Sequence, residues 1–259
     1  MIINSTIENI SDDLKLHFID IGDYDNTIIE AIKNSISKIC NGVAGDEDIE
    51  VLKIEMRNWF LGKDDAKVCG FISEFFCHLY LNQLNFEQHF LFRNLEETRA
   101  MKKGFDGLYQ FEDEIFLYES KSSLPTTLTS THNANIGEAY RDLRDKLNGS
   151  KLDSQGNPLD PWSNAVNHAS LQQINPNKTL IQNLNDFKKK FIKGRFENIK
   201  YFNIIPSSTI YMGSSWKNID IVDLKTKLLS LIKRYEYKKI NVICINKKSV
   251  DGFITYLNS

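Results

Sequence analysis

The stretch from Gly104 to Leu124, GFDGLYQFEDEIFLYESKSSL, constrains the fold more than any other part of the chain. Two runs rich in aromatic and aliphatic residues flank Glu112 and Asp113, which predicts a β-hairpin from about Phe105 to Ser122. Two-residue tips favour Asn-Gly or Asp-Gly, so the Glu-Asp pair fits poorly and leaves a slipped register or a longer loop open. The sequence therefore predicts two paired strands and leaves two geometries open for the tip.

Three charged residues interrupt this apolar hairpin. With Glu112 and Asp113 at the tip, Asp106 lies opposite Glu119, and the two-residue period of a strand puts Lys121 on the same face as Glu119. Opposed side chains have Cβ atoms roughly 4.5 to 5.5 Å apart, and like charges there repel. The two carboxylates therefore require a nearby cation.

An acid pair with a lysine beside it suits metal-assisted hydrolysis of a phosphodiester. The carboxylates of Asp106 and Glu119 would hold Mg²⁺, which prefers oxygen ligands and keeps several waters, and Mn²⁺ should substitute. Lys121 would orient or deprotonate the attacking water, or stabilise negative charge. The alternative is structural: Asp106 caps a turn and Glu119 pairs with Lys121 on a surface strand. Residue order, hairpin length and register together favour the catalytic interpretation.

A second acid, Glu74, lies within the apolar run from Asp65 to Leu84, whose length predicts a buried helix. An unpaired buried carboxylate is costly, so a metal ion would stabilise Glu74 as a further ligand. The alternative is an exposed acid on the outer side of a partly buried helix. His78, one turn later, is interpreted as a packed histidine rather than a ligand.

Elsewhere helices and strands interleave, which predicts an α/β fold with a central mixed β-sheet flanked by helices. Residues 1–60 form an N-terminal segment of unknown role that either packs on the core or binds a partner. Residues 61–259 form the main domain, with a proline-containing polar excursion at 151–178. Strands are expected near 14–21, 89–94, 200–206, 209–212 and 239–245, and helices near 27–40, 136–149, 180–194, 222–236 and the end of the chain.

Two groups of basic residues are candidates for contact with a DNA backbone. Arg141 and Arg144 are three positions apart on the helix expected at 136–149 and share a face. Lys188, Lys189 and Lys190 follow one another on the helix expected at 180–194, with phenylalanines interleaved. A solvated helix face and an amphipathic helix with buried phenylalanines are the respective alternatives. His132 lies in a turn-rich stretch and is expected to cap or to face solvent.

Composition limits the class of protein. A net charge of −2 does not indicate a strongly basic nucleic-acid-binding surface, so any DNA contact must come from local patches. The four cysteines have no zinc-ligand spacing and are expected to be reduced structural thiols. No run of about 18 apolar residues is present and the first residues do not resemble a secretory signal. We expect no membrane contact and a cytoplasmic location.

The order of these residues resembles the PD-(D/E)xK nuclease superfamily: an acid on a leading helix, an aspartate opening a hairpin, and ExK at its end. The stretches KGFDG, YESK and IGEAYRDLRDKL are similar to the HamA family, the nuclease subunit of the bacterial Hachiman anti-phage defence system. The resemblance covers Val68 to Leu147 well, the tail loosely and residues 1–60 little. Phe105 replaces the superfamily's proline, a position that varies.

This resemblance implies a restriction-endonuclease-like core and Mg²⁺-dependent cleavage of DNA. It assigns Asp106 and Glu119 as metal ligands, Lys121 as the catalytic lysine and Glu74 as the acid of the preceding helix. It also implies a partner, the superfamily-2 helicase HamB, which restrains the nuclease until infection or DNA damage. Two other functions stay open: a catalytically silent nucleic-acid- or helicase-binding module on the same fold, and a glycosidase with a carboxylate pair, which Lys121 disfavours.

Overall fold

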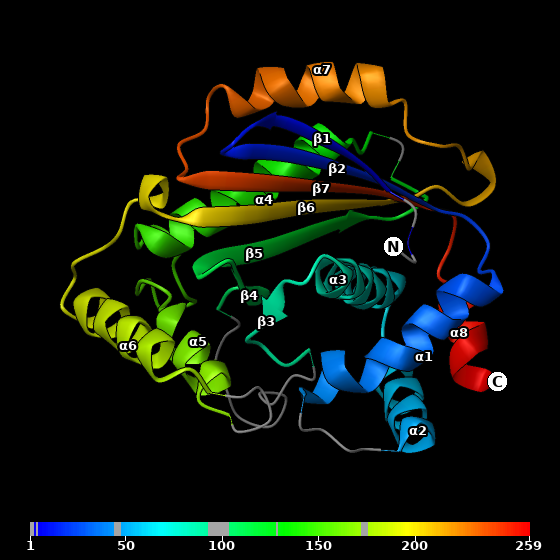
Figure 1. The fold of residues 1–259 in the computed structure, drawn as a ribbon, viewed down its shortest axis with the longest axis horizontal. Helices are drawn as coiled ribbons and strands as arrows, with labels where there is room; N and C mark the ends of the chain where they lie inside the picture. Colours follow the sequence, from blue (N-terminus) through cyan, green and yellow to red (C-terminus); the bar gives the residue numbers. More distant parts are fainter. Residues whose placement is uncertain (1–2, 4, 44–47, 93–103, 128, 172–175) are drawn as a thin grey trace.

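In a computed structural model, a seven-stranded mixed sheet lies at the centre of the molecule, with strand order β1-β2-β7-β6-β5-β4-β3 (Figure 1). The structure describes residues 3, 5–43, 48–92, 104–127, 129–171 and 176–259. The strands are β1 (Ser5–Ser11), β2 (Leu14–Ile21), β3 (Glu87–Gln88), β4 (Gly107–Phe111), β5 (Glu114–Ser123), β6 (Asn203–Tyr211) and β7 (Lys239–Lys247). Neighbours among β2, β7, β6 and β5 are parallel, and the flanking pairs are antiparallel.

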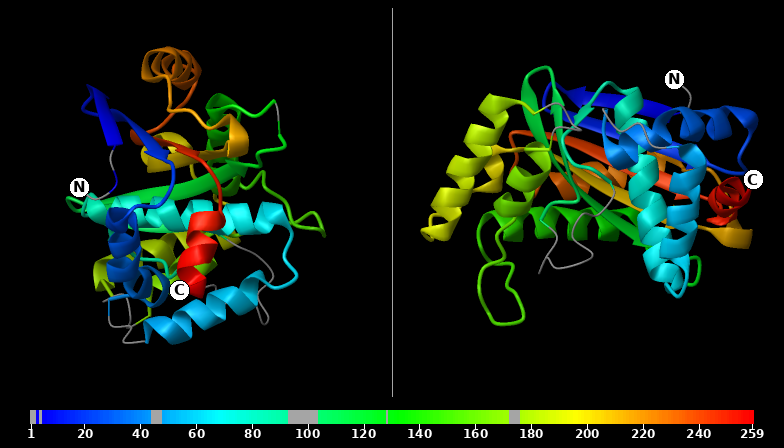
Figure 2. Two further views of the ribbon diagram at one scale, coloured as in Figure 1. Left: turned by 90° about the vertical axis from the view of Figure 1, so that its right-hand side faces the viewer. Right: turned by 90° about the horizontal axis from the view of Figure 1, so that it is seen from below.

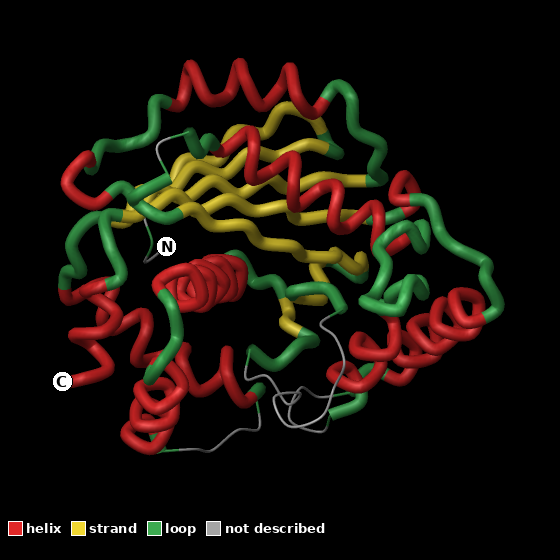
Figure 3. Tube along the Cα trace, turned by 180° about the vertical axis from the view of Figure 1, so that it is seen from behind, coloured by secondary structure: helices red, strands yellow, loops and turns green. Residues whose placement is uncertain are grey.

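Helices cover both faces of this sheet. They are α1 (Asn26–Asn41), α2 (Ile49–Phe60), α3 (Asp65–Gln83), α4 (His132–Leu147), α5 (Trp162–Ala169), α6 (Lys178–Ile192), α7 (Ile221–Ile232) and α8 (Asp251–Asn258). Figure 1 shows α1, α2, α3 and α8 gathered together, and the left panel of Figure 2 shows α7 and α2 at opposite extremes. Seen from behind, α4 crosses in front of the strands (Figure 3). The expected α/β class, a mixed sheet flanked by helices, is confirmed.

The central run of β7, Val242 to Ile245, is continuously apolar and suits the interior of the sheet, although the strand KINVICINK has polar residues toward both ends. A strand covered on both faces is apolar at nearly every position, unlike a half-exposed strand. Alternate side chains of β7 enter two separate cores: Ile243 and Ile245 pack with α1, α2, α3 and α8, whereas Val242 and Cys244 pack with α4, α5, α6 and α7. The two cores define the two faces, and α3 and α4 lie on opposite ones.

The N-terminal segment is continuous with the sheet. β2 pairs in parallel with β7 from Leu14↔Ile240 to Ile21↔Lys247, and β1 extends the sheet by pairing with β2. The sheet thus runs across the boundary expected at residue 60. The expected strand at 14–21 is confirmed, whereas β1 was not predicted, because its sequence STIENIS is polar and suits an edge strand with exposed side chains.

Three other expectations need correction. The strand expected at 89–94 is wrong for its described part, since pairing is confined to Glu87–Gln88; residues 93 and 94 lie outside the described residues. The separate strands expected at 200–206 and 209–212 are the single strand β6. The stretch expected to be turns before residue 136 begins α4, because Thr131 caps the helix by accepting a hydrogen bond from the Ala134 N–H.

Helix α4 ends at Leu147, close to Gly149, the last residue of the helix expected at 136–149. Gly149 has φ of +73°, and a Cβ there would lie 2.6 Å from the Phe196 ring. Glycine adopts this left-handed conformation without a steric penalty, so it both ends the helix and leaves room for the ring.

The hairpin has the register deduced from the sequence. Gly107 pairs with Tyr118 and Phe111 with Glu114, which leaves Glu112 and Asp113 as a two-residue tip. Both tip residues have positive φ, 48° and 63°. Positive φ at both central positions is the geometry of a type I′ turn, whose twist matches that of paired strands. The strand twist has therefore overridden an unfavourable pair of tip residues.

This turn leads to a stability prediction. Replacing Glu112 by Asn and Asp113 by Gly should raise the free energy of unfolding by about 1 kcal/mol, since a left-handed conformation costs other residues more than Asn or Gly. Urea unfolding of the double variant measures the change. As a control, Asp12→Asn with Asp13→Gly in the loop between β1 and β2 should give no gain, because neither residue has a positive φ. An equal gain in both variants would contradict the explanation.

Candidate active site

The hairpin brings Asp106, Glu119 and Lys121 together. The Asp106 N–H donates to the Tyr118 carbonyl at 3.1 Å, and its Oδ2 accepts a hydrogen bond from the Ser120 N–H at 2.8 Å. These two bonds hold Asp106 against the strand that carries Glu119. Lys121 Nζ lies 3.4 Å from Glu119 Oε1. The juxtaposition predicted from the hairpin register is therefore present.

Helix α4 lies over this cluster with a row of charged residues. Glu138, Asp142 and Lys146 are spaced four apart and so share one face of the helix. Lys121 Nζ is 2.6 Å from Asp142 Oδ2 and 4.0 Å from Glu138, while Lys146 Nζ is 2.5 Å from Glu119 Oε2. Sequence reasoning missed Lys146 and the pairing of Asp142, although the four-residue spacing was a usable signal.

Burial makes the electrostatics of the cluster strong. Glu119 is only 2% exposed, and burial together with the neighbouring Asp106 raises its pKa to about 7, against the opposing effect of Lys146 and Lys121. Burial lowers the pKa of Lys121, but Glu119, Asp142 and Asp106 outweigh it and hold this pKa well above its usual value. Lys121 is therefore an ammonium ion near neutral pH in this arrangement, suited to stabilising negative charge rather than to removing a proton.

Asp142 anchors two lysines beside the cluster. Its Oδ2 contacts Lys121, and its Oδ1 accepts a hydrogen bond from Lys151 Nζ at 2.8 Å. Burial alone would raise the pKa of Asp142, but these two ammonium groups lower it to about 2. Asp142 thus stays ionised and fixes the position of Lys121.

The carboxylates of Asp106 and Glu119 fit a Mg²⁺ site of two protein ligands. Proteins commonly bind Mg²⁺ through one or two carboxylates together with waters and substrate phosphates. The raised pKa of Glu119, beside two ammonium groups, shows that Asp106 and burial leave this carboxylate under-compensated. Additional positive charge between the two acids would therefore be stabilising.

Glu74 lies on α3, and in the described part of the chain it is not grouped with Asp106 and Glu119. Among the described residues, no group of three or more histidine, cysteine, aspartate or glutamate side chains is arranged to hold a metal ion. Helix α3 packs on the sheet face opposite to α4, whose Lys146 and Asp142 contact the ExK strand. Glu74 is half-buried, and both it and Asp106 raise the pKa of the intervening Cys77 thiol. The role of Glu74 as a metal ligand therefore stays a prediction.

The basic candidates for DNA contact are located on two helices. Arg141 and Arg144 are exposed on α4, and Arg144 pairs with Asp145 at 2.8 Å. Lys188 is half-exposed, and Lys189 and Lys190 are exposed, on α6. The amphipathic character expected for that helix is present, because Phe191 is buried and Phe187 stacks on Trp162 at 4.6 Å. The exposed basic groups are available to solvent.

Neither candidate histidine lies at the surface. His78 is buried and pairs with the Tyr109 hydroxyl, in agreement with the packed role preferred for it. His132 is buried at the start of α4, where its ring nitrogens contact Ser208 Oγ at 2.8 Å and Asn246 Oδ1 at 3.0 Å. Burial lowers the pKa of His132 to about 4. The surface role expected for His132 is therefore wrong.

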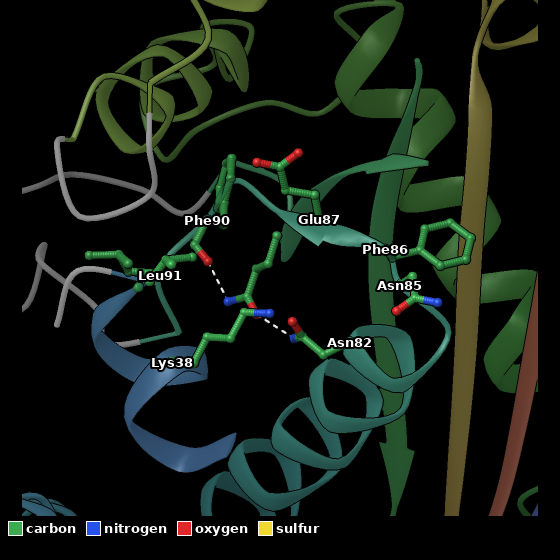
Figure 4. A pocket seen from close by; sticks show the side chains of 10 residues that line it. Lys38, Asn82, Asn85, Phe86, Glu87, Phe90 and Leu91 are labelled. Atoms are coloured by element: carbon green, nitrogen blue, oxygen red, sulfur yellow. Dashed lines mark hydrogen bonds between the residues drawn. The ribbon is translucent and has the colours of Figure 1, made fainter. Parts of the chain in front are cut away.

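A separate pocket of about 200 Å³ lies between α1, the end of α3 and β3 (Figure 4). Lys38, Asn82 and Phe90 are among its lining residues, and Gln88 bridges Asn82 and the Phe90 carbonyl within it. None of the predicted site residues lines this pocket. The acid and lysine cluster is therefore distinct from this cavity.

Comparison of the chain with protein-family models and with curated proteins found no match. In the part of the chain that the structure describes, no helix combines the length and the apolar character needed to cross a bilayer.

Proposed function

We propose that this protein is a metal-dependent DNA endonuclease of the PD-(D/E)xK type. The observation that carries the proposal is the meeting of Asp106, Glu119 and Lys121 at the end of one hairpin, which combines two carboxylates and an ammonium group in a largely buried setting. More specifically, we propose a nuclease related to the HamA family, the effector of a cytoplasmic anti-phage defence system held in check by a HamB-like superfamily-2 helicase. The residue order quoted for that resemblance supports this narrower assignment.

Each residue has a role that follows from its chemistry. A Mg²⁺ ion held by Asp106 and Glu119 would polarise the scissile phosphate and activate a water, with Mn²⁺ able to substitute. Lys121, held as an ammonium by its acidic neighbours, stabilises negative charge that develops on the phosphate and orients the water through its N–H groups. Asp142 keeps Lys121 in place. Exposed Arg141 and Arg144, on the same helix as Asp142, would bind the DNA backbone.

One observation favours a second function, a catalytically silent module that binds nucleic acid or a helicase. Both oxygens of Glu119 contact lysines, and Lys121 in turn contacts Asp142, so the charges that resemble a catalytic set also serve to dock α4 on the sheet. A protein that had lost catalysis could keep such a network for packing alone. The two functions differ in whether the carboxylates bind a metal ion.

The test of the nuclease proposal is cleavage of supercoiled plasmid by the full chain with Mg²⁺, alone and with a candidate helicase. The variant carrying Glu119→Ala and Lys121→Ala should cleave no faster than a reaction containing EDTA, because it lacks one metal ligand and the charge-stabilising ammonium. Its fold is checked by thermal unfolding. Cleavage that persists in the folded double variant would refute the assignment.

A matched control separates loss of the site from loss of surface charge. Replacing Glu114 and Lys238 by alanine removes a half-exposed ion pair, with a contact of 2.8 Å, at the start of β5 and away from the candidate site; it also removes the contact of Glu114 with Lys239. This variant should cleave plasmid at the wild-type rate. Absence of cleavage by the wild type under every metal and helicase condition, together with no Asp106-dependent Mn²⁺ binding, would favour the silent module.

A further inference from the structure

Lys146 is a buried lysine that has no role in the proposed cleavage reaction. It lies in the last turn of α4, and its side chain is only 7% exposed. Lysines are almost never this buried unless they are paired. Its Nζ lies 2.5 Å from Glu119 Oε2, a shorter contact than that of Lys121 with the other oxygen of the same carboxylate. Lys146 is therefore the nearer of these two counter-ions of Glu119.

This contact places an ammonium group where a metal ion would need to bind. Glu119 Oε1 faces Lys121 at 3.4 Å, and Oε2 faces Lys146. A divalent cation that binds Glu119 at Oε2 would be strongly repelled by a second positive charge at hydrogen-bond distance from the same oxygen. Metal binding and the Lys146 contact are then competing states of one carboxylate.

The surroundings offer Lys146 a second position. Asp142 lies one helical turn before Lys146, at the four-residue spacing that brings side chains together. Its two oxygens contact Lys121 and Lys151, and each carboxylate oxygen can accept a further hydrogen bond. The carbonyl groups at the end of α4 also favour a cation. The flexible four-carbon stem of lysine allows its ammonium group to move between such acceptors without a change in the helix.

We propose that Lys146 is the resident counter-ion of Glu119, that a divalent metal ion must displace it, and that Lys146 thereby sets the metal affinity of the site. The inference rests on the proposed function, because the competing ion is the one that a nuclease of this type would use. Lys146 acts as a positioning residue: it holds the Glu119 carboxyl group in place before the metal arrives and leaves it when the metal binds.

The test is Mn²⁺ affinity measured by isothermal titration calorimetry on the full chain near neutral pH. Lys146→Met should bind Mn²⁺ more tightly than the wild type by about 10-fold or more, because the competing charge is gone. Lys151→Met is the matched control: it removes a positive charge that contacts Asp142 but not Glu119, so its affinity should stay within about 2-fold of the wild type. Adding Glu119→Gln to Lys146→Met should abolish the gain.

A second variant covers the risk that methionine beside a buried carboxylate prevents folding. Lys146→Gln keeps an N–H donor for Glu119 without the charge and should also bind Mn²⁺ more tightly. In thermal unfolding, both variants should gain a larger increase in melting temperature from Mn²⁺ than the wild type does. Equal affinities in wild type and variants would overturn the proposal, and weaker binding in the variants would overturn it as well, by making Lys146 a support for the metal.

The outcomes distinguish this inference from the nuclease proposal. If the variants bind Mn²⁺ more tightly but the wild type never cleaves DNA, the competition stands and the nuclease function fails. If the wild type cleaves DNA in an Asp106-dependent way and all affinities are equal, only the role of Lys146 fails. If no form binds Mn²⁺, both are rejected.

Discussion

Asp106→Asn is expected to lower Mg²⁺-dependent plasmid cleavage by about 100-fold or more, a loss of about 2.7 kcal/mol of transition-state stabilisation. The change removes one of the two carboxylates that fit a metal ion. The amide oxygen of asparagine can still accept the hydrogen bond that the Ser120 N–H donates to Asp106 in the wild type. The fold should therefore survive while the charge is lost, and cleavage rates with thermal unfolding of the same samples measure the two effects separately.

The control for this variant is Asp23→Asn. Asp23 is also an aspartate in contact with a lysine, Lys248 at 2.7 Å, but its side chain is 84% exposed and it lies outside the candidate site. Its cleavage rate should equal that of the wild type. A folded Asp106→Asn protein that cleaves as fast as Asp23→Asn would show that Asp106 does not bind the metal.

The second large effect concerns a buried lysine on β7. Lys247 is fully buried, donates a hydrogen bond to the Tyr24 hydroxyl at 2.7 Å, and lies over the rings of Tyr24 and Phe76. Burial lowers its pKa to about 7. Below that pH the folded protein must hold a buried ammonium, which costs on the order of 5 kcal/mol relative to the exposed lysine of the unfolded chain.

The sign of the pH dependence follows from this lowered pKa. Between about pH 7 and pH 10, the unfolded chain keeps the Lys247 proton while the folded protein loses it, so the wild type gains stability as pH rises. Lys247→Met lacks this group. The free energy of unfolding of Lys247→Met minus that of the wild type should therefore be largest below pH 7 and shrink by about 1.4 kcal/mol per pH unit above it.

Urea unfolding at several pH values measures this difference. Subtracting the wild type from the variant removes contributions from groups that titrate in both proteins, including the buried thiols. Lys248→Met, the change of an exposed neighbour 40% accessible to solvent, should differ from the wild type by a constant amount over the same range. A constant difference for Lys247→Met too would mean that Lys247 keeps its proton in the folded state.

The charged residues Asp142 and Lys146 of α4 belong both to the candidate site and to the packing of this helix on the sheet. Asp142 and Lys146 contact Lys121 and Glu119 across the face on which α4 packs, so the same pairs that seat the helix also orient the candidate catalytic groups. A buried ion pair broken on one side is strongly destabilising, whereas a fully paired one need not add stability. Loss of activity in a variant of these residues therefore has to be separated from loss of folding, by thermal unfolding of the same samples.

Local pattern determined much of this protein. The alternation of apolar residues and the length of the two runs were sufficient to predict the hairpin and its register. The register in turn predicted that Asp106, Glu119 and Lys121 lie together. Such a prediction is possible because pairing across a short turn depends only on residues close together in the chain. The apolar run of α3 and the amphipathic pattern of α6 likewise determine helices by their period.

Only the tertiary structure decided which side chains from distant elements meet. Glu74 lies in an apolar run, as a buried ligand would, but its helix α3 packs on the sheet face opposite to α4, whose Lys146 contacts Glu119. From the sequence alone, Lys146 resembles an ordinary surface lysine of a polar helix. In the structure it is buried, because α4 packs over the ExK strand. The period of apolar residues determines which side chains share a face of a helix or strand. The order of strands and layers determines which other elements that face contacts, and this order depends on contacts between residues far apart in the chain.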